Sequence, residues 1–159
     1  MAELTIIGIG NRLRGDDALG PVLIDKLREV DWPEVELVDI GSDAIGLLEH
    51  LEDRHKVWIV DVCQMGRTPG SIVKFDPEDA DMVLDQDPLS LHGLGLAETI
   101  RMARSLQMVP EEFKIIGVEP DSIQFNTQLS QAVQQAMETI VKEISLELQH
   151  AAGKPQILL

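Results

Sequence analysis

The sequence of 159 residues has a single cysteine, few aromatic residues and few basic side chains for its acidic ones. One cysteine excludes a disulfide within the chain and any zinc or iron–sulfur site that needs several thiolates. Aromatic residues make up 3% of the chain and tyrosine is absent, so no stacking platform for nucleic-acid bases is expected. Asp and Glu total 28 against 13 Lys and Arg, a formal net charge of −15, which repels nucleic acid and anionic membranes.

Long hydrophobic runs are also missing. The first apolar run, residues 4–9, is interrupted by Thr5 and Gly8, and no basic residue precedes it. It therefore predicts neither a secretion signal nor membrane insertion, and we expect a cytoplasmic protein. The hydrophobic and charged fractions, 44% and 26%, are typical of globular proteins, and the length fits one domain over residues 1–159. We expect a monomer with a loose tail from about residue 150.

Short apolar, β-branched runs alternate with helical patterns along the chain. The runs at residues 4–9, 35–39, 57–62 and 114–118 predict strands buried on both faces, and 71–75 is a weaker candidate for an edge strand. Apolar residues at helical spacing recur over residues 19–30, 44–51, 96–106 and 129–148, with an N-cap for the last helix near Asn126 or Thr127. This alternation predicts a three-layer α/β/α domain with a mainly parallel central sheet and one antiparallel edge strand.

The loop after the first predicted strand carries two adjacent aspartates at the positions where a phosphate-binding loop would carry Lys and Ser or Thr. It reads Gly8-Ile9-Gly10-Asn11-Arg12-Leu13-Arg14-Gly15-Asp16-Asp17. Counted from Gly8, a dinucleotide fingerprint would need glycine at Leu13; counted from Gly10, a phosphate loop would need Lys and Ser or Thr at Asp16 and Asp17. Carboxylates at a helix start repel phosphate, so we interpret the two aspartates as helix caps or as cation ligands.

Other polar residues follow predicted strands, at the sheet edge where such folds bind ligands. Asp61 interrupts an apolar run, Asp39 ends the second strand, and His92 precedes a predicted helix. If they converge, Asp17, Asp61 and His92 offer two oxygens and one nitrogen, which suits nickel, manganese, iron or zinc and leaves positions open for a substrate. The simpler interpretations are an Asx turn for Asp39, a solvated His92, and a buried apolar role for Cys63 rather than that of a nucleophile.

Taken in order, these residues resemble the maturation endopeptidases of nickel–iron hydrogenases. The resemblance runs over nearly the whole chain, including the final helix, and the ordered set of motifs is specific although no single motif is. It is carried by Ile7-Gly8-Ile9-Gly10-Asn11, Gly15-Asp16-Asp17-Ala18-Leu19-Gly20, Val60-Asp61, Ser90-Leu91-His92-Gly93-Leu94-Gly95-Leu96 and Ile116-Gly117-Val118-Glu119-Pro120.

The resemblance implies a peptidase that removes a short C-terminal extension from a hydrogenase large-subunit precursor after nickel has been inserted. The family's metal-binding positions match Asp17, Asp61 and His92, the same trio that the strand ends select. The metal would be nickel supplied by the precursor, and other divalent ions could occupy the site. The family often has Glu where this chain has Asp17, and Gly-Gly-Thr where it reads Ile40-Gly41-Ser42.

Roles beyond metal recognition are expected for residues of the same loops. Asp17 and Asp39 are the candidate catalytic residues. Asp39, Gly41, Gly10 and Asn11 are the candidate substrate-binding residues. For the chemical step, either a carboxylate activates water or the docked metal polarises the scissile carbonyl.

Two other classes of protein share parts of this pattern. Receiver domains of response regulators also place an acidic pair after strand one and an aspartate after strand three. In this chain, however, residues 11–15 separate strand and pair, and Glu119-Pro120 stands where receivers carry Lys-Pro. A nucleotide-binding domain is disfavoured by the glycine count and by the acids that would repel phosphate.

Overall fold

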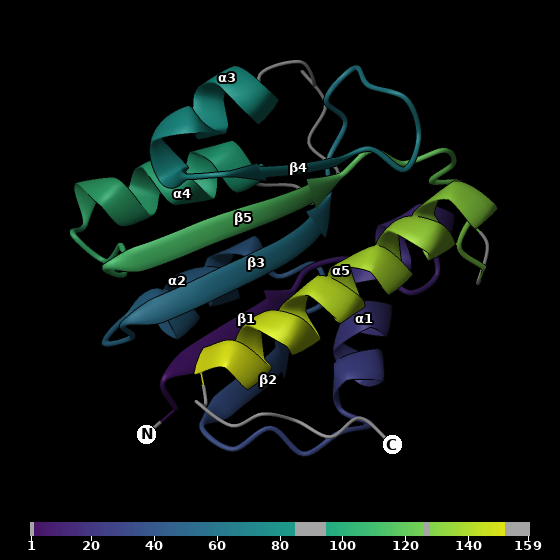
Figure 1. Ribbon diagram of the computed structural model, residues 1–159. Coiled ribbons are helices and arrows are strands. Elements are labelled where there is room, and N and C mark those ends of the chain that lie inside the picture. The colour runs from purple at the N-terminus through teal and green to yellow at the C-terminus, as the bar shows by residue number, and fades with distance from the viewer. Residues whose placement is uncertain (1, 85–94, 126–127, 152–159) are drawn as a thin grey trace.

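The computed structural model describes residues 2–84, 95–125 and 128–151 of the chain. At its centre is a sheet with strand order β2-β1-β3-β5-β4 (Figure 1). The strands are β1 (Leu4–Gly8), β2 (Val35–Asp39), β3 (Lys56–Val62), β4 (Ile72–Phe75) and β5 (Glu112–Val118). Neighbouring strands are parallel except β4, which runs antiparallel to β5 at one edge. The predicted sheet, mainly parallel with one antiparallel edge strand, is confirmed.

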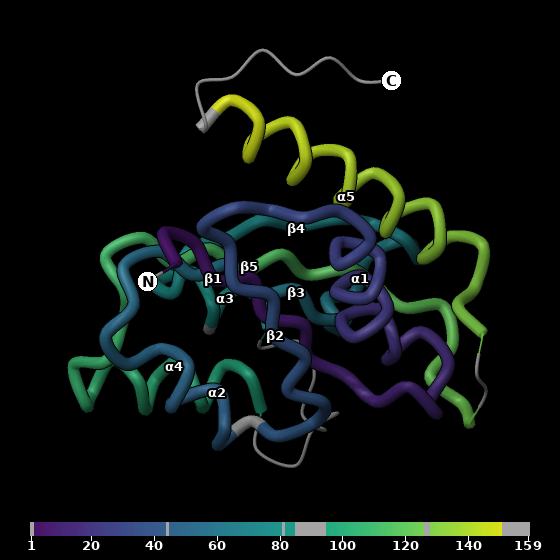
Figure 2. The backbone as a smooth tube through the Cα atoms, turned by 90° about the horizontal axis from the view of Figure 1, so that it is seen from below, coloured from purple at the N-terminus to yellow at the C-terminus, as the bar shows by residue number. Residues whose placement is uncertain are grey.

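Helices cover both faces of the sheet (Figure 2). One face is covered by α1 (Leu19–Leu27) and α5 (Gln131–Ala151). The other is covered by α2 (Ala44–Leu51), α3 (Ala80–Leu84) and α4 (Leu96–Ser105). Short 3-10 helices, η1 (Gly15–Ala18) and η2 (Pro77–Asp79), lead into α1 and α3. The result is the expected three-layer α/β/α domain, and no helix within the described ranges is long and apolar enough to cross a membrane.

Alternating side chains of the strands build two cores, one on each face. In β1, Ile6 packs under α1 and α5, whereas Ile7 packs under α2 and α4. In β3, Trp58 and Val60 belong to the first core and Ile59 to the second. Because successive residues of a strand point to opposite faces, a strand covered on both sides needs apolar residues at almost every position. This requirement explains why continuous apolar runs predicted these strands.

The register aligns the carboxyl ends of the parallel strands. Gly8, the last residue of β1, is paired with Asp39 of β2 and with Val60 of β3. Asp61 of β3 is in turn paired with Gly117 of β5. Loops that leave these four strands therefore begin at one edge of the sheet, which we call the carboxyl edge.

Two glycines allow α1 to begin in direct backbone contact with β1. A Cβ atom on Gly8 would lie 2.4 Å from the carbonyl oxygen of Gly20, and one on Gly20 would lie 2.3 Å from that of Ile9. Such distances exclude a side chain at either position. The close contact fixes the start of α1, and with it η1, at the end of β1.

The structure differs from the sequence-based expectations in three helical regions. Val30 lies beyond the end of α1 and is half exposed, so the predicted helical stripe over residues 19–30 is too long. The last helix begins at Gln131, so the predicted N-cap near Asn126 or Thr127 is wrong; these two residues lie outside the described ones. The short helix α3 was not expected. The predicted loose tail falls almost entirely on residues 152–159, outside the described ones.

Candidate active site

Four carboxylates are buried at the carboxyl edge. The exposed fraction is 1% for Asp16, 0% for Asp17, 1% for Asp61 and 7% for Glu119. Asp16 and Asp17 follow β1, Asp61 lies near the end of β3, and Glu119 directly follows β5. Because a charge buried without partners costs several kcal/mol, the groups around each carboxylate show what it does.

Asp17 is held by the turn that precedes it. Its Oδ2 atom accepts a hydrogen bond from the backbone N–H of Asn11 at 3.1 Å, and its carbonyl oxygen lies 3.1 Å from the same N–H. Asn11 in turn accepts from the backbone N–H of Leu13 with its side chain, at 2.9 Å, and from that of Arg14 with its carbonyl. Gly10, at φ +151°, has the backbone conformation that this tight turn needs. The first loop is therefore a rigid frame around Asp17.

Asp16 serves a structural purpose. Its Oδ2 atom accepts from the backbone N–H groups of Asp121 and Ser122 at 2.8 and 3.0 Å and from the hydroxyl of Ser130 at 2.9 Å. Its Oδ1 atom accepts from the N–H of Ser130 at 2.6 Å. Ser130 directly precedes α5. Its hydroxyl accepts a hydrogen bond from the backbone N–H of Val133, so Ser130 is the N-cap of α5. The expectation that Asp16 caps its own helix is thus wrong: it ties the first loop to the start of α5.

Asp61 lies on the face of the sheet that α2 and α4 cover. The face follows from strand alternation, because Val57 and Ile59 belong to the core on that side. The 3-10 helix that carries Asp17 contacts β3, so the two buried aspartates reach the same edge from neighbouring strands. Cys63 lies two residues beyond Asp61.

Cys63 is a buried apolar residue surrounded by negative charge. Burial, followed by the charges of Asp61, Glu119 and Asp17, raises the pKa of the Cys63 thiol well above its usual value. The thiol points at the carbonyl oxygen of Asp61, 3.8 Å away. A thiol that keeps its proton is a poor nucleophile, so the environment of Cys63 favours the buried apolar role. The carboxylates of Asp61, Glu119 and Asp17 all contribute to this rise in the pKa of the thiol.

Glu119 shapes the loop after β3, a role that sequence reasoning missed. Its Oε1 atom accepts from the backbone N–H groups of Met65 and Arg67 at 2.8 and 2.9 Å. Its backbone N–H and carbonyl also bind Ser71 and Gly70. The available signal was a carboxylate at the end of a buried strand, as it was for Asp61.

Asp39, the candidate catalytic and substrate-binding residue, is engaged on both carboxylate oxygens. Its Oδ1 atom accepts from the backbone N–H of Gly41 at 2.9 Å, which is the Asx turn considered above, and its Oδ2 atom pairs with Arg12 at 2.9 Å. Arg12 also forms a two-pronged pair with Asp25 of α1 at 2.6 and 3.0 Å. The hydrogen bond from Arg12 lowers the pKa of Asp25. Arg12 thus joins the first loop to α1 and to the end of β2.

Gly10 and Gly41, two other candidate substrate-binding residues, are joined by a backbone hydrogen bond of 2.9 Å from the N–H of Gly10. A Cβ atom on Gly10 would lie 1.9 Å from the carbonyl oxygen of Asp17, whereas one on Gly41 would meet no atom within 4 Å. The structure therefore brings Gly10, Asn11, Asp17, Asp39 and Gly41 into one connected set of loops. Their roles toward a substrate stay predictions.

His92, the third member of the predicted metal trio, lies outside the described residues. The helix that follows it, α4, starts at Leu96, which packs on the core of the face to which Asp61 belongs. Within the ranges that the structure describes, no group of three His, Cys, Asp or Glu residues is arranged to hold a metal ion. Since the trio includes His92, its convergence remains a prediction.

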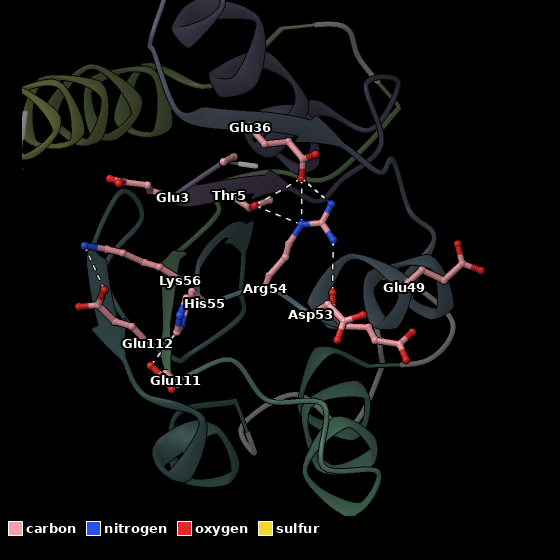
Figure 3. A pocket seen from close by; sticks show the side chains of 12 residues that line it. Glu3, Thr5, Glu36, Glu49, Asp53, Arg54, His55, Lys56, Glu111 and Glu112 are labelled. Carbon is pink, nitrogen blue, oxygen red and sulfur yellow. Dashed lines mark hydrogen bonds and ion pairs between the residues drawn. The ribbon is translucent and has the colours of Figure 1, made fainter.

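A hollow of about 880 Å³ lies at the opposite edge of the sheet (Figure 3). Arg54 points into it and binds Glu36 at 2.7 Å and Thr5 at 3.2 Å. Lys56 pairs with Glu112 at 3.0 Å on its other side (Figure 3). The hollow lies at the amino ends of the parallel strands, away from the buried aspartates. Because α/β sheets of this kind bind ligands at the carboxyl ends, we place the candidate site there.

Comparisons with known proteins identify the family of this chain. A model of the hydrogenase maturation protease family matches residues 21–147, most of the chain. The hydrogenase expression/formation protein HoxM of Cupriavidus necator is 27% identical over 152 residues, covering 94% of this chain and 75% of that protein. Among curated proteins, other matches carry similar names, including the hydrogenase 2 maturation protease of Escherichia coli.

Solved structures agree. The hydrogenase maturating endopeptidase HybD from E. coli matches with a TM-score of 0.80 at 25% identity, covering 95% of this chain and 94% of that one. The hydrogenase 2 maturation peptidase from Thaumarchaeota archaeon SCGC_AB-539-E09 is 31% identical, with a TM-score of 0.67 and coverage of 92% and 97%. These matches favour the peptidase interpretation over a receiver or a nucleotide-binding domain. The chain belongs to the hydrogenase maturation protease family and is a peptidase.

Proposed function

We propose that this protein removes the C-terminal extension of a nickel–iron hydrogenase large-subunit precursor after nickel insertion. The observation that carries the proposal is a pair of buried aspartates at the carboxyl edge. Asp61 lies near the end of β3, and Asp17 lies in η1, which follows β1 and contacts β3. Family membership supports the class of reaction. Two buried carboxylates of like charge form a site that a bound cation would stabilise.

In this proposal Asp17, Asp61 and His92 bind the nickel that the precursor already carries. Two carboxylate oxygens and one imidazole nitrogen suit a divalent transition metal, and other divalent ions can take the same place. Like charges at close range raise the free energy of the empty site, and a cation relieves that repulsion. Docking of nickel-loaded precursor is thereby favoured over docking of the empty precursor, which ties cleavage to metal insertion.

Two routes to hydrolysis fit this site. In the first, a carboxylate, with Asp17 as the candidate, accepts a proton from the attacking water. In the second, the precursor's nickel polarises the scissile carbonyl, and the aspartates only hold the nickel in place. Asp39 is proposed as a supporting acid or peptide-positioning group, and Gly10, Asn11 and Gly41 are proposed to line the path of the extension.

The partner in this proposal is the precursor alone, and the enzyme acts on it as a monomer in the cytoplasm. The negative charge of the chain, formally −15, supports the expectation that nucleic acid is not a partner.

A processing assay tests the proposal. The purified protein is incubated with candidate precursors, with and without inserted nickel, and the precursor mass is measured. We expect a small mass loss for nickel-loaded precursor only. The variants Asp17→Ala, Asp61→Ala and His92→Ala should fold and fail to process it. Normal processing by one variant would remove that residue from the site, and cleavage that ignores nickel would refute the metal-recognition step.

A further inference from the structure

Two large apolar side chains are exposed to solvent on the loops that lie beside the buried aspartates. Leu13, in the loop after β1, is 59% exposed, and Phe125, in the loop after β5, is 83% exposed. Both loops leave the carboxyl edge of the sheet. Large apolar residues held in water are unfavourable, and when they gather near a functional site they often mark a surface that a partner covers.

The two loops are joined by hydrogen bonds and close backbone contacts, so the fold itself holds Leu13 and Phe125 at this edge. The backbone N–H of Asp16 donates to the carbonyl of Ser122 at 2.9 Å, and the Asp16 carboxylate accepts the hydrogen bonds described above. A Cβ atom on Gly15 would lie 2.8 Å from the carbonyl oxygen of Ser122 and 3.1 Å from that of Gln124, which directly precedes Phe125. Figures 1 and 2 both show the two loops side by side at the end of the sheet.

Leu13 is also tied to the candidate site itself. Its backbone N–H is held by the side chain of Asn11, whose own N–H binds Asp17. Leu13 therefore cannot shift without disturbing the turn that orients Asp17.

We propose that Leu13 and Phe125 form a docking surface for the hydrogenase precursor, packing against an apolar patch of it beside its metal centre. This inference rests on the proposed function and adds the residues that position the substrate protein. The surface is continuous with the site through the Asn11 turn, which is why the precursor, rather than a second copy of this chain, is its occupant. Neither residue touches the reacting atoms; both contribute to affinity.

Steady-state processing of nickel-loaded precursor tests the proposal with Leu13→Ser, Phe125→Ser and the double variant. Burying one large apolar side chain is worth about a tenfold change in affinity, so each single variant should raise KM about tenfold and leave kcat within about twofold. Because the lost contact is apolar, the ratio of KM values should persist at high ionic strength. The thermal midpoint should move by no more than about 2 °C.

Leu106→Ser is the matched control. Leu106 is 56% exposed, but it lies at the end of α4, toward the opposite edge of the sheet. Its substitution should leave KM unchanged. If the wild type processes the precursor and the Leu13 and Phe125 variants have the KM of the Leu106 variant, the docking surface is refuted and the proposed function stands. If the wild type processes no precursor, both are refuted.

Discussion

Asp16 and Asp17 are neighbours in the sequence, but their carboxylates bind different parts of the fold. Asp17 accepts from Asn11, six residues earlier, whereas Asp16 accepts from Ser130, 114 residues later. One aspartate thus holds the first loop in its turn, and the other fastens that loop to α5. The candidate site depends on both, although only Asp17 is proposed to contact the substrate's nickel.

Replacing Asp16 should destabilise the protein strongly. Asp16→Ala removes the buried carboxylate that accepts from the N–H groups of Asp121, Ser122 and Ser130, which should lower the free energy of unfolding by about 3 kcal/mol. Asp43→Ala is the control, because Asp43 caps α2 at an exposed position through one bond to Gly46 and should cost about 1 kcal/mol. Urea unfolding measures both. Equal losses for the two variants would contradict the structural role of Asp16.

The two glycines of the candidate site should respond differently to alanine. Gly10→Ala places a methyl group against the carbonyl oxygen of Asp17 at a φ that alanine rarely adopts, and should cost about 3 kcal/mol or more. Gly41→Ala has open space around its Cβ position and only the strain of φ +58°, so about 1 kcal/mol is expected. Thermal unfolding of both variants checks the order, and a larger loss for Gly41→Ala would contradict it.

The Arg12 network should give a stability difference that depends on pH. Since the hydrogen bond from Arg12 lowers the pKa of Asp25, the folded state favours the ionised carboxylate. This contribution is present above the unfolded pKa, about 3.9, and is lost as pH falls through the lower folded value. Arg12 and Asp25 are about half exposed, so Arg12→Gln should cost at most about 1 kcal/mol at neutral pH.

The unfolding free energies of wild type and Arg12→Gln should therefore converge as pH falls below about 3.9. Lys26→Gln, which removes an exposed pair with Glu29 just beyond the end of α1, should have a smaller effect at neutral pH. A difference between wild type and Arg12→Gln that grows on acidification would contradict the assigned charge state.

Cys63 should be dispensable for processing. Its raised pKa keeps the thiol protonated in the folded protein, so Cys63→Ala should retain processing and lose about 1 kcal/mol of stability for the atoms removed. The thiol also sets an alkaline limit: the wild type should lose stability as pH rises above the unfolded thiol pKa of about 8.5, and the variant should lack this component. A folded Cys63→Ala variant without processing activity would restore Cys63 as a candidate nucleophile.

Local patterns predicted the strands well because the sheet is buried on both faces. Residues 35–39 were predicted as observed, and β3 and β5 extend the predicted strands by one and two residues at their amino ends. The helix starts were harder. Ser130 becomes the cap of α5 because Asp16 binds it from the far end of the chain, and no local pattern around residue 130 reveals that contact.

The candidate site was only partly accessible from the sequence, for a similar reason. Strand ends selected Asp17 and Asp61, because topology alone brings these positions to one edge. The structural role of Asp16 and the anchoring of the loop after β3 by Glu119 depend on tertiary hydrogen bonds, which composition and spacing do not encode. Asp39 illustrates the limit: its Asx turn was foreseen as an alternative, whereas its pair with Arg12 was not.

The most direct test of the account is a crystal structure of the protein soaked with Ni²⁺, with data collected at the nickel absorption edge. We expect one anomalous peak at the carboxyl edge, about 2.0–2.2 Å from carboxylate oxygens of Asp17 and Asp61 and from an imidazole nitrogen of His92. A peak bound elsewhere, or an imidazole of His92 directed away from both aspartates, would contradict the proposed nickel-recognition site.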